Sequence, residues 1–296
     1  MKKIPVIFVL ILLAASGVFL YAQRCKVWAC NDEIKYSAPT PSPSKIKSPL
    51  QNPPALPESE AGYSIPDLNK TIKFPVFNYH HLGPMPENAD INRRVFTVTP
   101  ELFEEHLKYF RDNGYQVVLV DELIKYFKIG KSLPEKAVAI TFDDGYLEHY
   151  QNAFPLLKKY NVKATFFIPT GWVGTSTRGD MMSWAQIKEM SDAGMIIGSH
   201  AMTHPNLMNL SDEDLKKELE ESKKIIEGRI GKVCDLLAYP GGNHDARVIE
   251  AVANAGYKGA LSVYKIIQQA PRYIYSIRRF HADDNMSSIV DKLVDY

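Results

Sequence analysis

Residues 137–146 read AVAITFDDGY, a short apolar run that ends in two adjacent carboxylates and a glycine. The apolar part, which ends at Phe142, has the length of a buried strand that stops at a turn. Asp143 and Asp144 then follow the end of a parallel strand, where catalytic residues lie in strand–helix barrels. Because neighbouring residues of a strand point to opposite faces, one carboxylate can bind a metal while the other accepts a proton. A polar turn that closes a strand explains the same residues without any function, so a second signal is needed.

The second signal is a pair of histidines in residues 198–205, which read GSHAMTHP. His200 and His204 follow another apolar run, at residues 195–197. Neutral imidazoles are ligands of zinc and similar divalent ions, and catalytic zinc takes three protein ligands and leaves one position for water. One aspartate and two histidines make such a set. A histidine pair at this spacing is also common at surface turns, but here each of the two signals supports the other.

From Phe74 onward, strand-like and helix-like segments alternate, which favours an α/β architecture. We expect strands at residues 74–79, 115–120, 137–142, 164–168, 195–197, 236–239 and 259–263, and we expect residues 273–280 to end the barrel. We expect helices at residues 99–113, 121–127, 149–160, 183–193, 211–230, 244–255 and 286–294. The helix at 211–230 carries Glu and Lys at spacings that pair along a helix, so we interpret its charged residues as a solvated surface.

Three motifs resemble those of a known family, and they are TFDDG at 141–145, SHxxxH at 199–204 and AYPGG at 238–242. In this order they are similar to the motifs of the polysaccharide deacetylases of carbohydrate esterase family four, a nodulation-type deacetylase domain. The resemblance extends from about Phe74 to the C-terminus and includes PVFNYHH at 75–81 and SIRRF at 276–280. It implies an α/β fold, a distorted (β/α) barrel of the polysaccharide deacetylase type.

The resemblance also implies roles for the residues of the first two motifs. Asp143 would be the general base, and Asp144, His200 and His204 would hold one divalent metal, with zinc as the expected ion. Such an ion lowers the pKa of water and polarises the acetyl carbonyl. The expected reaction is therefore the hydrolytic removal of an acetyl group.

The third motif departs from the commonest family form. By resemblance it lines the pocket, so Tyr239 is expected to act in catalysis and substrate binding, and the amide near Gly241 to hold the oxyanion. The usual arginine before the Tyr-Pro segment, which positions the base, is absent here, since Ala238 occupies that place. In a subgroup of the family the arginine comes late in the chain, and Arg279 is the candidate here, with Arg278 second. An arginine fork can bind a carboxylate through both oxygens and keep it ionised. An exposed arginine is the alternative.

Three further residues have open roles. Many family members carry a Leu-x-His whose histidine is the general acid, but the last histidine here, His281 in RRFHADD, lacks that leucine. The acid is therefore His281, a metal ligand or water. His80 follows the first strand and either contacts the substrate or is a satisfied loop residue. Trp172 lies in a glycine-rich loop, where it either stacks on a sugar ring or packs.

The N-terminus predicts export. Two lysines precede a nearly uninterrupted apolar run at residues 4–22, so residues 1–24 are interpreted as a signal peptide or membrane anchor. The run approaches the length that spans a bilayer, and an uncleaved anchor is narrowly favoured. The lysines would remain in the cytoplasm, which places the rest of the chain outside. Residues 25–70 are a proline-rich linker, and residues 71–296 form the deacetylase domain.

Charge and cysteine content restrict the partners. The formal net charge of +1 gives no case for nucleic-acid binding. Three cysteines are too few for a disulfide scaffold. Cys25 and Cys30 could pair outside the membrane, whereas Cys234 lies in an apolar run and is expected to be a buried thiol.

The expected function is metal-dependent deacetylation of an acetylated polysaccharide outside the cell, either N-acetylglucosamine-containing polysaccharide or peptidoglycan. Hydrolysis of O-acetyl esters, as on xylan, uses the same kind of site and is the first alternative. The second is a barrel that binds glycans without turnover, because one fold hosts many functions. A metal-dependent nuclease or phosphatase would need more carboxylates for two metals, and the sequence does not show them.

Overall fold

The computed structural model describes residues 67, 70–176, 179–264 and 266–294. The predicted signal segment at 1–24, most of the predicted linker at 25–70 and the pair Cys25 and Cys30 lie outside these ranges. Among the described residues, no helix is both long and apolar enough to cross a membrane.

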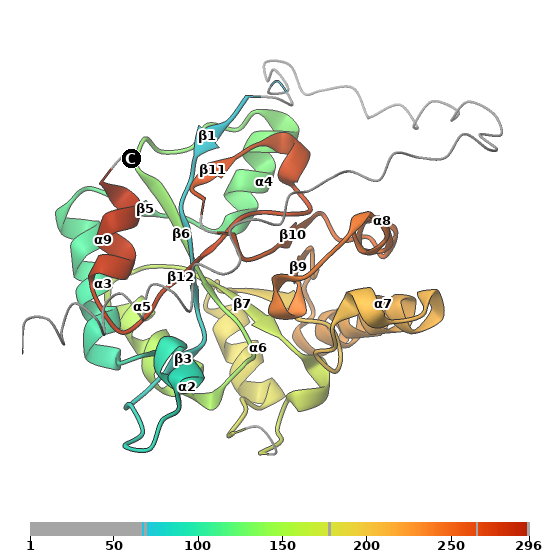
Figure 1. The fold of residues 1–296 in the computed structure, drawn as a ribbon, viewed down its shortest axis with the longest axis horizontal. Coiled ribbons are helices and arrows are strands. Elements are labelled where there is room, and N and C mark those ends of the chain that lie inside the picture. The colour runs from blue at the N-terminus through green and yellow to red at the C-terminus, as the bar shows by residue number, and fades with distance from the viewer. Residues whose placement is uncertain (1–66, 68–69, 177–178, 265, 295–296) are drawn as a thin grey trace, which may run out of the picture. The chain divides into compact units, whose positions relative to one another are not determined.

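A parallel sheet forms the centre of the described domain (Figure 1). Its strand order is β10–β9–β8–β7–β6–β2–β12, and β5 also pairs with β6. The strands are β2 (Val76–Tyr79), β5 (Gln116–Val117), β6 (Ala137–Phe142), β7 (Thr165–Ile168), β8 (Ile196–Ser199), β9 (Leu236–Ala238), β10 (Gly259–Leu261) and β12 (Phe280–His281). Two small sheets pair β1 (Ile72–Lys73) with β11 (Gln268–Gln269) and β3 (His81–Leu82) with β4 (Thr97–Val98).

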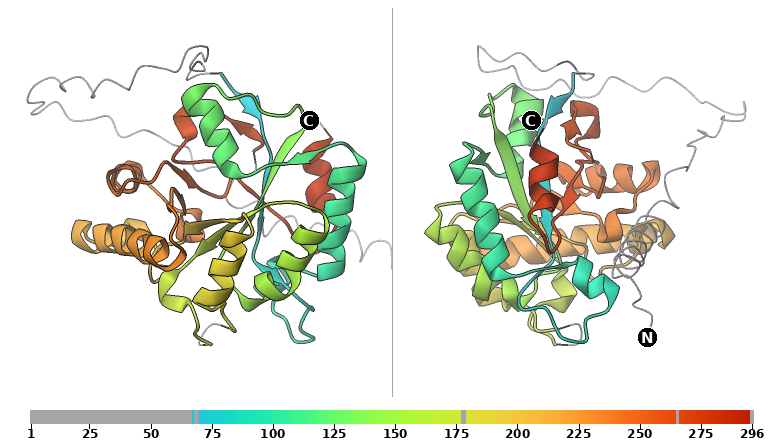
Figure 2. Two further views of the ribbon diagram at one scale, coloured as in Figure 1. Left: turned by 180° about the vertical axis from the view of Figure 1, so that it is seen from behind. Right: turned by 60° about the vertical axis from the view of Figure 1, so that its left-hand side comes forward.

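Helices surround the sheet on its outer side (Figure 2). They are α2 (Ile91–Val95), α3 (Pro100–Asp112), α4 (Val120–Ile129), α5 (Phe154–Lys159), α6 (Trp184–Asp192), α7 (Asp212–Ile230), α8 (Ala246–Asn254) and α9 (Ser287–Leu293). Their starts follow local chemistry: Thr99 caps α3, and Ser183 with Gln186 forms a capping box on α6. The α/β barrel-type fold expected from the sequence is confirmed.

The segment before β12 closes the sheet into a distorted barrel. Ile277 pairs with Leu261, the last residue of β10, and three residues later Phe280 pairs with Phe77 of β2. The segment therefore contacts both edges of the sheet. Residues 273–280, which were expected to end the barrel, are not one continuous strand, because a segment that crosses between two edges cannot pair along its length with either. A 3₁₀ turn, Pro271–Tyr273, lies at the start of this segment.

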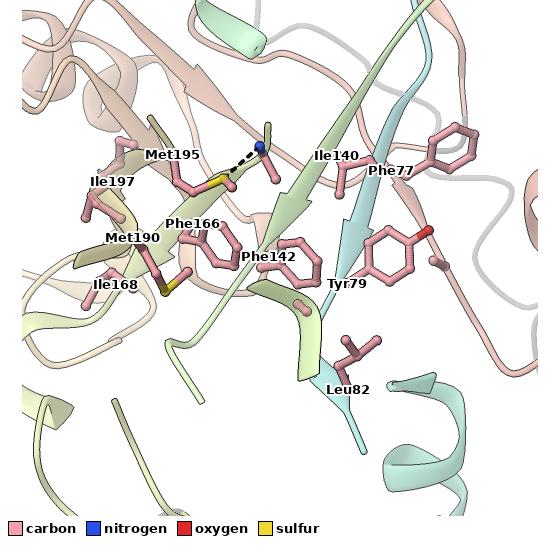
Figure 3. Packing of buried hydrophobic residues seen from close by; sticks show 14 of the residues in the cluster. Phe77, Tyr79, Leu82, Ile140, Phe142, Phe166, Ile168, Met190, Met195 and Ile197 are labelled. Atoms are coloured by element: carbon pink, nitrogen blue, oxygen red, sulfur yellow. Dashed lines mark hydrogen bonds between the residues drawn. The ribbon is translucent and has the colours of Figure 1, made fainter. Parts of the chain in front are cut away.

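Strand β6 shows how the core is divided. All six of its residues are buried, as expected for a parallel strand covered on both faces. Val138, Ile140 and Phe142 face the large cluster between sheet and helices, where Phe142 stacks on Phe166 at 4.7 Å between ring centroids (Figure 3). The small residues Ala137 and Ala139 face a second cluster that includes α4.

Two other expected elements have different bounds. The strand expected at 115–120 is only β5, because Val120 already begins α4. The helix expected at 149–160 begins with a π-type turn, His149–Ala153, and continues as α5. Pro155 lies at the start of α5, where a residue without an N–H is tolerated.

Helix α7 begins one residue after the predicted start, because Ser211 is its N-cap, and the helix is not entirely a solvated surface. Glu218 is only 8% exposed, and Ser222 is fully buried one turn later. The prediction that its charged residues are all surface is therefore wrong at Glu218. Cys234 is a buried free thiol, as expected.

Candidate active site

Asp143 lies directly after β6 and forms a buried ion pair with Arg279. Arg279 Nη1 donates to Oδ1 at 2.7 Å and Nη2 donates to Oδ2 at 2.8 Å. The exposed fractions are 2% for Asp143 and 1% for Arg279. The predicted two-oxygen contact with a late arginine is confirmed for Arg279. The second candidate, Arg278, instead lies over the ring of Tyr273, with its guanidinium carbon 4.0 Å from the ring centroid.

Neighbouring polar groups fix the orientation of this pair. Arg279 Nε donates to Ser262 O at 3.0 Å, and Nη1 also contacts Asn78 Oδ1 and Thr141 Oγ1 at 3.1 and 3.2 Å. Asn78 Nδ2 donates to Asp143 Oδ2 at 3.1 Å. Because both charges are paired and further hydrogen-bonded, their burial is compensated.

The pair controls the ionisation of Asp143. Burial alone raises the pKa of this carboxyl, but the adjacent Arg279 guanidinium lowers it more, and the net pKa lies well below its usual value. An arginine does not lose its proton in proteins, so the carboxylate stays ionised over the physiological range. Asp143 is therefore chemically suited to accept a proton.

The three predicted metal ligands lie together beside it. The Nε2 atoms of His200 and His204 lie 3.6 and 3.4 Å from Asp144 Oδ1. One ligand atom from each residue falls within 4.8 Å of the others. Asp144 and His200 are buried, and His204 is partly exposed.

Local structure orients these ligands. His200 Nδ1 lies 2.8 Å from Ala238 O, and because a carbonyl only accepts, Nδ1 carries the proton and Nε2 keeps its lone pair. Asp144 and His204 have left-handed backbones, with φ of 74° and 60°. Strained non-glycine residues of this kind cluster at ligand and active sites.

A divalent ion fits this set by two observations. Asp144 Oδ1 is buried and has no hydrogen-bond partner among the described residues. Its separations of 3.4 and 3.6 Å from the imidazole nitrogens resemble the ligand spacing of a tetrahedral zinc site, roughly 3.3–3.5 Å for bonds of about 2.0–2.2 Å. Burial raises the pKa of Asp144, because removal from water disfavours the charged carboxylate.

Of the two histidines with open roles, His80 lies nearer to Asp143. Its Nε2 is 4.0 Å from Asp143 Oδ2, and burial holds the pKa of His80 well below its ordinary value. His281 packs on His80, with ring centroids 5.1 Å apart, and its Nε2 donates to Val95 O at 2.6 Å. Sequence reasoning had no basis for preferring His80 to His281, because these two histidines are distant in the chain and the pairing of β2 with β12 brings them together.

The remaining candidates, Tyr239, Gly241 and Trp172, have different surroundings. The Tyr239 side chain is buried. Its hydroxyl donates to Tyr275 O at 2.8 Å, and its ring stacks on His244, so the side chain packs within the protein. Gly241 has a left-handed φ of 65° in the turn after β9. Trp172 lies against His204, with ring centroids 4.9 Å apart, and is partly buried.

A further layer of residues was not anticipated from the sequence. Tyr146 hydrogen-bonds to Asp144 and stacks on His81 at 3.9 Å between ring centroids. Glu148 contacts His81 Nδ1 at 3.5 Å and accepts a hydrogen bond from Arg93 at 3.1 Å. Burial raises the pKa of Glu148, but its partners, chiefly His81 and Arg93, bring the net pKa to about 2. The available signal was the position of Tyr146, directly after the Asp-Asp-Gly turn.

Comparison with known proteins finds similar sequences and similar folds. Residues 130–260 match the family model described as polysaccharide deacetylase. The chain is 28% identical to the putative polysaccharide deacetylase YxkH of Bacillus subtilis, over 92% of this chain and 94% of that protein. It is 29% identical to the poly-beta-1,6-N-acetyl-D-glucosamine N-deacetylase of Staphylococcus aureus, over 67% of this chain and 72% of that protein.

Solved structures with similar folds include the deacetylase PplD of Streptococcus pyogenes in complex with acetate. Its TM-score is 0.68 at 26% identity, over 76% of this chain and 98% of that one. IcaB from Ammonifex degensii has a TM-score of 0.66 at 25% identity, over 75% of this chain and 96% of that one. In its barrel fold, and over residues 130–260 in its sequence, the chain is similar to the polysaccharide deacetylases.

Proposed function

We propose that this protein is a metal-dependent deacetylase that removes acetyl groups from the N-acetylglucosamine units of a polysaccharide or peptidoglycan outside the cytoplasm. The observation that carries the proposal is the three-residue ligand set beside a carboxylate held by an arginine. Relatives named as N-deacetylases of poly-beta-1,6-N-acetyl-D-glucosamine support the amide over the ester as the bond that is cleaved.

In this proposal Asp144, His200 and His204 hold one divalent ion, and zinc is the ion that best suits one carboxylate and two imidazoles. When bound there, the ion supplies a lowered pKa for water and polarisation of the acetyl carbonyl. The partly exposed side of His204 gives the site access to solvent and substrate.

Asp143 acts as the general base, because its lowered pKa leaves it ionised and its neighbours fix its direction. It accepts a proton from the attacking water, a contribution of roughly a hundredfold to ten-thousandfold to the rate. Arg279 contacts no substrate in this scheme and acts through Asp143.

The leaving nitrogen needs a proton, and His80 is the residue that we propose delivers it. Its Nε2 lies 4.0 Å from Asp143 Oδ2, so the ring must first move closer by about 1 Å. The proton that Asp143 took from water then passes to Nε2 and from there to the leaving nitrogen, which returns both side chains to their starting states. His281, whose Nε2 is engaged by Val95 O, supports the His80 ring. The oxyanion is held by the backbone amide near Gly241, at the turn that follows β9.

The location of the enzyme is part of the proposal. The basic and apolar N-terminus directs export, and the proline-rich segment after it separates the catalytic domain from the membrane. A polymeric substrate outside the cell suits both features.

Acetate release from a panel of acetylated glycans tests this function. We expect release from N-acetylglucosamine polymers, little release from O-acetylated xylan, loss of activity after chelation and recovery with zinc. Faster release from the ester would favour the esterase alternative. Full activity in the continued presence of a strong chelator would contradict metal dependence.

A further inference from the structure

The loop between the two histidine ligands has a backbone that needs support from outside. Ala201 and His204 both have left-handed conformations, with φ of 62° and 60°. Non-glycine residues keep such conformations only where the surrounding structure over-determines them. The contacts that hold this loop therefore decide where the two imidazoles lie relative to each other.

Helix α7 supplies the main contact through a buried carboxylate. Glu218 Oε2 accepts hydrogen bonds from the backbone N–H groups of Met202 at 2.7 Å and Thr203 at 2.9 Å. Its Oε1 accepts from Thr203 Oγ1 at 2.6 Å. Three donors from two consecutive loop residues thus converge on one side chain. The bonds are charge-assisted, which makes them stronger than neutral ones.

The same face of α7 holds the beginning of the loop. Ser222 lies four residues after Glu218 and therefore next to it on the helix surface. Ser199 Oγ donates to Ser222 Oγ at 2.8 Å and accepts from the N–H of Ala201 at 3.1 Å. Ser199 directly precedes the first ligand, His200, so α7 contacts the chain on both sides of that ligand.

The opposite side of the loop is held by backbone alone. The N–H of Gly171 donates to Met202 O at 2.8 Å. A Cβ at position 171 would lie 2.9 Å from that same oxygen, so a larger residue would displace the loop. Met202 is therefore fixed through its N–H by Glu218 and through its carbonyl by Gly171.

We propose that Glu218 is a positioning residue of the metal site. Its carboxylate holds the loop at residues 201–203 in the conformation that directs His204 Nε2 towards Asp144 and His200 before an ion binds. Glu218 contacts neither the ligand atoms nor the substrate. The inference rests on the metal site of the proposed function and adds to it the part of the protein that preorganises the ligands.

The test compares Glu218→Ala and Glu218→Gln with the wild-type protein, with Glu220→Ala as a matched control on the exposed side of the same helix. Zinc affinity is measured by competition with a chromogenic chelator. The geometry of the ligands is read from the visible absorption of the cobalt-loaded protein. Thermal unfolding of the metal-free protein checks the fold.

We expect Glu218→Ala to weaken zinc binding roughly 10–100-fold and to change the cobalt spectrum, as loss of an outer partner of a metal ligand does. Glu218→Gln should recover most of this affinity, because its carbonyl oxygen accepts the two backbone N–H groups while its amide donates to Thr203 Oγ1. Glu220→Ala should bind zinc as the wild type does.

A folded Glu218→Ala protein with wild-type zinc affinity and an unchanged cobalt spectrum overturns the proposal. Where Glu218→Ala does not fold, Thr203→Val decides, because Thr203 is exposed and the change removes only one of the three hydrogen bonds. We expect severalfold weaker zinc binding from it, and unchanged binding overturns the proposal. A wild-type protein that binds neither zinc nor cobalt contradicts the proposed function itself.

Discussion

The ends of β6 and β8 carry the two halves of the site, and the protein holds them in opposite ways. Asp143, after β6, is held by the positive charge of Arg279, which is 136 residues later in the chain. The histidine loop after β8 is held from the outer layer by Glu218, a negative group that accepts backbone hydrogen bonds. A buried base needs a cation to remain ionised, whereas neutral imidazoles need only a fixed backbone.

The largest effect should come from replacing Asp143 and Asp144, one at a time, with asparagine. Asp143→Asn should lower turnover by roughly a hundredfold to ten-thousandfold, because it removes the proton acceptor, while zinc binding remains. Asp144→Asn should lose zinc affinity as well as turnover, because it removes an anionic ligand. Metal content and acetate release measured on both variants distinguish the roles. Loss of bound zinc in Asp143→Asn would contradict the assignment of Asp143 as the proton acceptor and Asp144 as the metal ligand.

Arg279→Ala removes the cation that pairs with Asp143 at the end of β6. An unpaired buried carboxylate costs about 3–5 kcal/mol of the free energy of unfolding. Without the guanidinium, burial raises the pKa of Asp143, so the acidic limb of kcat/KM should move to higher pH. Denaturant unfolding and a pH–rate profile measure the two effects.

Arg278→Ala is the matched control for this experiment, because its guanidinium lies over Tyr273 and not at Asp143. It should leave both the stability and the pH profile nearly unchanged. Equal effects of the two substitutions would contradict the specific role of Arg279.

The smallest expected effect concerns His106. Unlike the metal-ligand candidates His200 and His204, it is a histidine buried in the core. It contacts the Tyr79 hydroxyl at 3.0 Å, and burial lowers its pKa to about 4. The unfolded chain binds this proton at a pKa of about 6.5, so stability is full above that pH and falls as the pH drops towards 4. At a pH below both pKa values, the free energy of unfolding is lower by about 3 kcal/mol.

Unfolding curves of the metal-free protein at pH 7 and at lower pH measure this contribution. His106→Gln should reduce the pH dependence without removing it, because burial also lowers the pKa of His149 to about 4. An unchanged slope in His106→Gln would show that His106 does not titrate as its burial implies.

The sequence was most informative where one short segment carries the signal. The run of β6 and its two aspartates is local, and so is the histidine pair after β8. Arg279 was found through the family resemblance: Ala238 occupies the usual position of the arginine, and a subgroup of the family carries this arginine late in the chain.

Contacts between distant segments could not be derived in this way. The approach of His80 to Asp143 depends on the register of β2 against β6. In the sequence, Glu218 cannot be distinguished from the other glutamates of a charged helix. Its position next to the histidine loop follows from the packing of α7 against β8. The path of residues 273–280 between two sheet edges also depends on pairing with distant strands, so the sequence does not reveal it.

The central claim is that Asp144, His200 and His204 bind one cation while Asp143 remains outside its coordination. Anomalous diffraction at the zinc edge from crystals of the zinc-loaded protein tests it most directly. We predict one peak at about 2.0–2.2 Å from a carboxylate oxygen of Asp144 and from both Nε2 atoms, with Asp143 still paired with Arg279. A peak coordinated by Asp143, or no peak among these three residues, would contradict the account.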